Sequence, residues 1–270
     1  MPTIKAGNIN LEYYAEGEGQ PLILIRGFSS DCSNWGDAFL DPLRAQFKVI
    51  RFSNRGTGLS DKPDGPTSVR QMADDAANLL TALGIAQAHV FGVSMGGMIS
   101  QELALNHPDK VSGLVLGCTI PGGPQTVGAG PEIVGTLMPQ PGLSREDLIR
   151  KAWPALVVPA FIESHRDFLE AMMRLALEHP TPIETFAKQS AAVREFDAFD
   201  RLPQITASTL VIHGDSDVLL RHENGALVAG LIPNSKFKTI EGVGHMFFWE
   251  KPAESAAAII EFLARVPQAA

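Results

Sequence analysis

The sequence has few cysteines and no concentrated run of basic residues. Its 270 residues include only Cys32 and Cys118, too few for a disulfide-stabilised secreted scaffold, so we interpret both as reduced thiols. The formal net charge is −8, and an acidic chain without a Lys/Arg-rich segment repels phosphate backbones. The composition therefore argues against a nucleic-acid partner.

Long apolar segments are also missing. No run of hydrophobic residues reaches the length that a membrane-spanning helix requires, and residues 1–20 lack the apolar stretch of a signal peptide. We therefore expect a cytoplasmic protein without a membrane partner. The composition is compatible with a homo-oligomer but does not predict one.

Short apolar runs, by contrast, are frequent. Hydrophobic residues make up 45% of the chain and charged residues 19%, which is sufficient for a large core. Runs that are apolar at consecutive positions are typical of strands covered on both faces. Residues 3–14, which break at Gly7-Asn8, predict an antiparallel hairpin. The predicted buried strands are 22–25, 49–52, 89–91, 113–116, 210–212 and 237–240.

Helical patterns separate several of these strands. Ser68 and Gln71 have the spacing of a capping box, and Gly84 offers a left-handed stop after the apolar residues that follow. The last helix is predicted to begin near Pro252. Strands that alternate with helices predict an α/β fold, in which helices flank a mostly parallel sheet.

The alternation stops in residues 121–203. Gly/Pro-rich segments open this stretch, and helical patterns follow without strands, for example at 166–177. A further helix is predicted to have Pro182 at its first position. We predict a helical cap of residues 121–203 on a core of residues 1–120 and 204–270. The alternative is a helical decoration that does not contact the substrate.

The most informative segment is Gly92-Val-Ser94-Met-Gly96, which joins a predicted buried strand to a predicted helix. A tight strand-to-helix turn strains its central residue, and bulky neighbours would clash, so glycines flank the serine. The N-terminus of the helix presents unpaired N–H groups to developing negative charge. We predict that Ser94 is a nucleophile.

At this point the chain resembles the α/β-hydrolase family over nearly its whole length. Residues 92–97 match the family's nucleophile motif, and residues 52–60 are similar to its loop after the second long strand. The resemblance implies an α/β-hydrolase sheet, and within the family it is to small esterases and lactonases with a helical cap, including enol-lactone and acyl-homoserine-lactone hydrolases. Ser53 stands where the family usually has Asp. The glycine turn that follows leaves Arg55 free to pair or to cap.

A serine hydroxyl needs a base to take its proton, and seven histidines are available. His245 lies in a glycine-containing loop between the last predicted strand and the last helix, and the family has its base in this loop. We therefore predict that His245 is the base. The other histidines are expected to stop a helix (His107), to lie on the surface (His165, His179 and His222) or to lie at strand ends (His89 and His213).

Two aspartates follow the predicted strand 210–212, at the edge of the sheet where sites of open α/β folds lie. The acid should hold the imidazole of His245 in the correct tautomer. The family has its acid three residues after the strand-ending glycine, which selects Asp217 and leaves Asp215 as the alternative. A metal site made of His213 and both aspartates has no second ligand cluster in the sequence, so we predict no metal.

The oxyanion hole requires two backbone donors. One is the N–H of Met95, which follows the nucleophile, and the other is expected from Phe28, in the loop after strand 22–25. Arg26 stands in this loop where the family usually has His. It would either pair with a carboxylate or lie on the surface.

The sequence lacks a dinucleotide-binding glycine motif, a Walker loop and a zincin motif, so no cofactor is predicted. We predict that the partner is a small apolar ester or lactone, hydrolysed through an acyl-enzyme. Carbon–carbon bond hydrolysis and cofactor-free perhydrolysis use the same three residues and are alternatives, as is a small-molecule receptor with a hydrolase fold. The residues considered for an apolar pocket, each by itself more typical of a core, are Phe28, Trp35, Met138, Trp153, Phe161 and Phe247.

Overall fold

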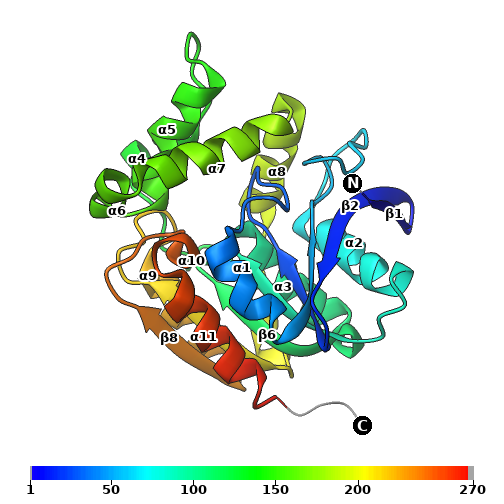
Figure 1. Cartoon of the computed structure of the whole chain (residues 1–270). Coiled ribbons are helices and arrows are strands. Elements are labelled where there is room, and N and C mark those ends of the chain that lie inside the picture. The colour runs from blue at the N-terminus through cyan, green and yellow to red at the C-terminus, as the bar shows by residue number, and fades with distance from the viewer. Residues whose placement is uncertain (1, 267–270) are drawn as a thin grey trace.

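The computed structural model describes residues 2–266, which form an eight-stranded sheet with the order β1-β2-β4-β3-β5-β6-β7-β8 (Figure 1). β2 pairs antiparallel with β1 and β4, and all later neighbours pair in parallel. The hairpin and the mostly parallel sheet are therefore confirmed. The strands are β1 (Thr3–Ala6), β2 (Ile9–Glu16), β3 (Gln20–Ile25), β4 (Phe47–Phe52), β5 (Ala88–Val93), β6 (Val111–Gly117), β7 (Ser208–Gly214) and β8 (Ser235–Ile240).

Each strand contains the apolar run that predicted it, but coverage on both faces is wrong for β8. This strand lies at the edge of the sheet and pairs only with β7. Phe237 is 37% exposed, and Lys236 and Lys238 on either side of it are exposed as well. Lysines on an edge strand discourage pairing with another chain.

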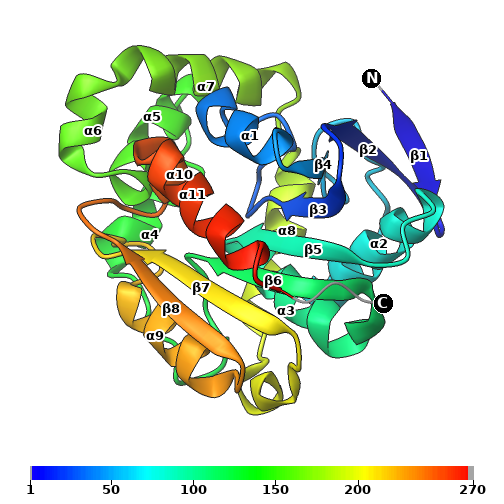
Figure 2. The same cartoon turned by 60° about the horizontal axis from the view of Figure 1, so that its bottom comes forward.

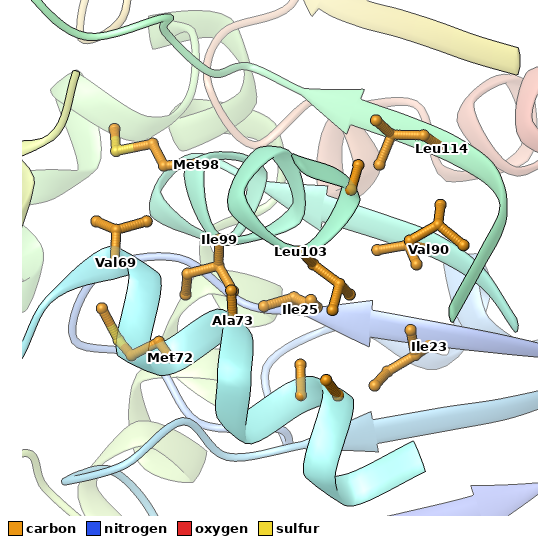
Figure 3. Close-up of a cluster of buried hydrophobic side chains, with 14 of the residues drawn as sticks. Ile23, Ile25, Val69, Met72, Ala73, Val90, Met98, Ile99, Leu103 and Leu114 are labelled. Atoms are coloured by element: carbon orange, nitrogen blue, oxygen red, sulfur yellow. The ribbon is translucent and has the colours of Figure 1, made fainter. Parts of the chain in front are cut away.

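Helices cover both faces of the sheet (Figure 2). Figure 3 shows side chains of α2 and α3 packed against Ile23 and Ile25 of β3 and against Val90 of β5. Leu22 and Leu24 belong to the core on the opposite face, which explains why β3 is apolar at consecutive positions. One face carries α2 (Val69–Ala82), α3 (Met95–Asn106) and α9 (His222–Leu231), and the other carries α1 (Asp37–Arg44), α10 (Phe247–Glu250) and α11 (Pro252–Leu263).

The predicted ends of the core helices are confirmed. Ser68 Oγ accepts a hydrogen bond from the Gln71 N–H at 3.1 Å, which caps α2. Gly84, just beyond α2, has a φ of 69°, as a left-handed stop requires, and α11 begins at Pro252. The helices of the described chain all fall short of the length and apolarity that crossing a membrane requires.

The insertion between β6 and β7 is helical, as predicted. Its two ends meet, because Gly122 forms an isolated bridge with Asp197 and the Ala198 N–H donates to the Pro121 carbonyl at 2.8 Å. Figures 1 and 2 both show α4 to α7 gathered at one end of the molecule. The helices of the insertion are α4 (Pro131–Leu137), α5 (Arg145–Leu156), α6 (Pro159–Ser164), α7 (Arg166–Glu178) and α8 (Ile183–Glu195). A short 3-10 helix, η2 (Phe199–Gln204), precedes β7, and another, η1 (Pro108–Lys110), precedes β6.

The predicted start of α8 is wrong by one residue. Pro182 has extended backbone angles (φ −61°, ψ 150°) and precedes the helix, which begins at Ile183. Thr181 does not cap the helix, since its Oγ1 donates instead to the Ser29 carbonyl at 3.2 Å. A tertiary contact with the loop after β3 therefore replaces the local capping interaction.

Arg55 forms a buried ion pair rather than a cap. Its Nε and Nη2 each donate to the Asp75 carboxylate at 2.6 Å. We expect Arg55→Met to lower the free energy of unfolding by about 3 kcal/mol, because Asp75 would remain as an unpaired buried charge. Burial raises the pKa of Asp75 and Arg55 opposes this effect, so the loss in the variant should shrink as falling pH protonates Asp75.

Thermal unfolding of this variant between about pH 5 and pH 8 measures both effects. The matched control is Arg70→Met, since Arg70 forms an exposed pair with Asp74 at 3.8 Å and should matter little. Equal losses in the two variants, or a loss that grows as the pH falls, would contradict the assignment.

Candidate active site

Ser94 occupies the strained position that its glycine neighbours predicted. It lies between β5 and α3 with a φ of 61°, a value that non-glycine residues rarely adopt. A Cβ at Gly92 would collide with the Gly96 carbonyl, and a Cβ at Gly96 would collide with the Ile25 carbonyl. Both glycines are therefore needed for the close packing of this turn.

The loop after β3 packs directly against the serine. A Cβ at Gly27 would lie 2.9 Å from Ser94 Cβ and 3.3 Å from Ser94 Oγ. The two predicted donors, the backbone N–H groups of Phe28 and Met95, flank this contact in sequence. Neither N–H donates a hydrogen bond to another residue of the described chain.

His245 pairs with Asp217 and not with Asp215. The distance from His245 Nδ1 to Asp217 Oδ2 is 2.8 Å, and both side chains are buried. Asp215 is exposed, and its Oδ1 accepts the Gly242 N–H at 2.7 Å. Of the two aspartates, the one that the family resemblance selected therefore contacts the imidazole, and the other accepts a hydrogen bond from the loop that carries His245.

The surroundings of Asp217 keep it ionised. Its Oδ1 accepts the N–H groups of Leu219 and Leu220, each at 2.9 Å. Burial by itself would raise the pKa of Asp217, but the charge on His245 and hydrogen bonds from His213 and His245 outweigh it, so the pKa lies well below its usual range. A carboxylate in this state fixes the proton of His245 on Nδ1 and leaves Nε2 as the basic nitrogen.

His213 also contacts Asp217, which was not predicted from the sequence. Its Nε2 lies 2.7 Å from the Leu220 carbonyl and 3.2 Å from Asp217 Oδ2. Because a carbonyl oxygen only accepts, Nε2 must carry the proton and can donate to both oxygens. The available signal was its position directly before Gly214, at the end of the strand that precedes Asp217.

Glu250 holds the histidine loop against the insertion. Its carboxylate accepts the Gly244 N–H at 2.7 Å and the Val158 N–H at 2.9 Å. The Met246 N–H donates to the Leu156 carbonyl at 2.8 Å. Burial raises the pKa of Glu250, and these two amide hydrogen bonds oppose the increase. The residues on both sides of His245 are therefore fixed to the segment that joins α5 and α6.

Ser94 and His245 line one cavity of about 380 Å³. No hydrogen bond joins the two side chains within residues 2–266, and such bonds are often long in free enzymes. The core and the insertion share the wall. The insertion contributes most of the apolar residues of the wall, including Leu148, Ile149, Trp153, Leu169, Met172, Met173 and Phe186.

Only two of the six residues considered for an apolar pocket line the cavity. Phe28 and Trp153 line the cavity. Trp35, Phe161 and Phe247 do not, and they belong to the core beside the sheet. Met138 is 37% exposed and also lies outside the cavity wall. These four residues therefore do not belong to the pocket, and the preference for a core position is confirmed for Trp35, Phe161 and Phe247. Residue type by itself does not reveal which side chains turn to the cavity.

Cys118 lies beside Asp217 and His245. Its Sγ, one carboxylate oxygen of Asp217 and one ring nitrogen of His245 all lie within 4.8 Å of one another. Burial, and then the charge of Asp217, raises the pKa of the Cys118 thiol well above its usual range. The Cys118 thiol is therefore protonated at neutral pH and packs as a small, weakly polar neighbour of Asp217 and His245.

A model of the α/β-hydrolase fold family matches residues 20–252, and the chain belongs to this family. A relative from Azorhizobium caulinodans, assigned as the carbamate hydrolase RutD, is 27% identical over 271 residues, covering 99% of this chain and 100% of the relative. The enol-lactonase from Burkholderia xenovorans LB400 superposes with a TM-score of 0.85 at 23% identity, covering 98% and 100% of the two chains. A thermophilic esterase from Thermogutta terrifontis gives 0.82 at 28% identity, covering 99% of each chain.

Proposed function

We propose that the protein hydrolyses carboxylic esters or lactones through an acyl-enzyme on Ser94, with His245 as base and Asp217 as its partner. The observation that carries the proposal is the arrangement at one cavity. A serine held at a positive φ and a histidine paired with a buried carboxylate line the same space. Family membership adds support, since the order Ser, Asp, His along the chain is typical of this fold.

The proposed reaction has two halves. His245 Nε2 takes the proton of Ser94 as Oγ attacks the carbonyl carbon, and the backbone N–H groups of Phe28 and Met95 stabilise the oxyanion. The carbon–oxygen bond of the ester then breaks, and the imidazolium returns the proton to the leaving alkoxide. In the second half water attacks the acyl-enzyme, His245 takes the proton of the water, and Ser94 leaves with it. The products are an acid and an alcohol, or a hydroxy acid from a lactone.

The choice of esters and lactones is supported by two similar structures. One is a lactonase and the other an esterase, and the esterase shares 28% of its residues with this chain. The cavity is compatible with such substrates. Its wall is mostly apolar, and its volume is sufficient for a small ester. Because one relative is assigned as a carbamate hydrolase, carbamates are the most informative alternative substrates to test.

A kinetic panel tests the proposal. We expect turnover of p-nitrophenyl esters and aliphatic lactones by the wild type and none above background by Ser94→Ala. The same panel should include a p-nitrophenyl carbamate, a vinylogous diketone, and an ester with hydrogen peroxide. Exclusive turnover of one of these three would replace the ester assignment, and binding of all substrates without turnover would indicate a receptor.

We further propose that residues 121–203 act as a cap that sets the preferred chain length. Met172 on α7 lines the cavity, whereas Met138 does not. Met172→Ala should shift the preference towards longer acyl groups, because each additional buried methylene contributes about 0.8 kcal/mol, or about fourfold in kcat/KM. The kcat/KM series from acetate to decanoate esters measures the shift. Met138→Ala, which removes the same atoms outside the cavity, is the control, and identical profiles in both variants would reduce the insertion to a decoration.

A further inference from the structure

Arg26 is a buried cation in the wall of the same cavity. It directly follows β3 and is 1% exposed. Its guanidinium carbon lies 5.0 Å from the ring centre of Trp35, 5.1 Å from that of Phe248 and 5.8 Å from that of Trp249. Three aromatic rings therefore pack close to the guanidinium.

These rings do not satisfy the N–H groups of Arg26. Its Nε and Nη1 are buried without a hydrogen-bond partner in the described chain. Asp31 is the acidic residue whose charge acts on Arg26, yet its Oδ1 accepts instead from Ser33 at 2.8 Å and from Asn34 at 3.3 Å. Unsatisfied buried donors on a charged group are unfavourable, and residues at a functional site are where they persist.

Arg26 stays charged in this environment. Burial lowers the pKa of Arg26 to about 10, and the charge of Asp31 opposes the decrease. At neutral pH the guanidinium is therefore protonated. The residues that line the cavity include Arg26 and the exposed Arg145 but no aspartate or glutamate. The cavity thus combines a mostly apolar wall with a positive charge that has no acidic partner in that wall.

We propose that Arg26 binds a carboxylate group on the substrate, so that the preferred substrates are half-esters of dicarboxylic acids or lactones that carry a carboxylate. This inference rests on the proposed ester or lactone hydrolysis and narrows it. The planar guanidinium presents pairs of N–H groups that match the two oxygens of a carboxylate. The buried surroundings of Arg26 strengthen the two hydrogen bonds that such a pair would form. The adjacent Gly27 packs on Ser94, which places the bound anion and the reacting carbonyl in one cavity.

Matched charged and neutral esters test the inference. We would compare kcat/KM for monomethyl glutarate with dimethyl glutarate, where the carboxylate is on the acyl side. A second pair, 4-acetoxybutanoate and its methyl ester, has the carboxylate on the alcohol side. The wild type should prefer the charged member of at least one pair, and the pair with the larger ratio identifies the side. Arg26→Met should reduce that ratio by about 10- to 100-fold, because hydrogen bonds to a charged group are lost.

Two further variants distinguish a direct contact between Arg26 and the carboxylate from a general electrostatic attraction by positive charges in the cavity wall. Arg145→Met removes the same charge from an exposed position in the cavity wall and should change the ratio by less than about threefold. Arg26→Lys keeps the charge without the planar fork and should fall between the wild type and Arg26→Met. Equal losses in Arg26→Met and Arg145→Met, or no preference for the charged ester in the wild type, would overturn the proposal.

Two measurements distinguish failure of the Arg26 proposal from failure of the proposed ester or lactone hydrolysis. Fluorophosphonate labelling of Ser94 shows whether each variant is folded with an accessible serine. Binding of glutarate, followed by tryptophan fluorescence because Trp35 and Trp249 contact Arg26, does not require hydrolysis. Glutarate binding that Arg26→Met abolishes, without ester turnover by the wild type, would support the anion site and reject ester hydrolysis. Ester turnover without glutarate binding would support ester hydrolysis and overturn the anion site.

Discussion

Ser94→Ala is expected to lower kcat by about four to six orders of magnitude while the protein stays folded. The variant removes only the oxygen that attacks the substrate. The hydrogen bond from the Ser94 N–H to the Gly117 carbonyl, at 2.9 Å, does not involve that oxygen. The same holds for the bond from Thr119 Oγ1 to the Ser94 carbonyl, at 2.8 Å. Both backbone contacts remain in the variant, so thermal unfolding should change little.

A fluorophosphonate gives an independent measurement of the same serine. The reagent should label the wild type at Ser94 and leave Ser94→Ala unlabelled. Ser30→Ala is the matched control, since Ser30 lines the same cavity but its Oγ donates to the Phe28 carbonyl at 3.3 Å. Labelling should persist in Ser30→Ala. Labelling of Ser94→Ala at another residue, or turnover close to that of the wild type, would remove Ser94 from the mechanism.

Asp217→Asn is expected to lower kcat by about four orders of magnitude, and Asp215→Asn by less than about tenfold. An asparagine at 217 can present its NH₂ group to His245 Nδ1, which stabilises the tautomer whose Nε2 is already protonated. That tautomer cannot take the proton of Ser94. An asparagine at 215 keeps the oxygen that accepts the Gly242 N–H, so the histidine loop retains its support.

Steady-state kinetics of both variants on one ester measure the ranking. Thermal unfolding shows whether each loss is chemical, because Asp217 also accepts the Leu219 and Leu220 N–H groups. Equal unfolding temperatures together with the expected ranking would support the role of the carboxylate in orienting His245. The reverse ranking would move that role to Asp215.

The sequence by itself determined the α/β fold and the residues that lie at the carboxyl edge of the sheet. Consecutive apolar residues are compatible with a strand covered on both faces, and the glycines around Ser94 are compatible with only a narrow set of turns. These are local constraints, so they can be read before the chain is folded. The resemblance to the family, which has its acid three residues after the strand-ending glycine, selected Asp217, and the structure brings that residue within 2.8 Å of His245.

Only the tertiary structure decided which side chains surround the site. His213 contacts Asp217 because the turn after β7 folds back on the strand, and Thr181 bonds to Ser29 across a separation of 152 residues. Arg26 was compatible with a paired or a surface residue, yet it is buried among the rings of Trp35, in the loop that follows it, and of Phe248 and Trp249 on the distant α10. Contacts of this kind depend on how helices and loops pack, and neither residue type nor periodicity specifies that packing.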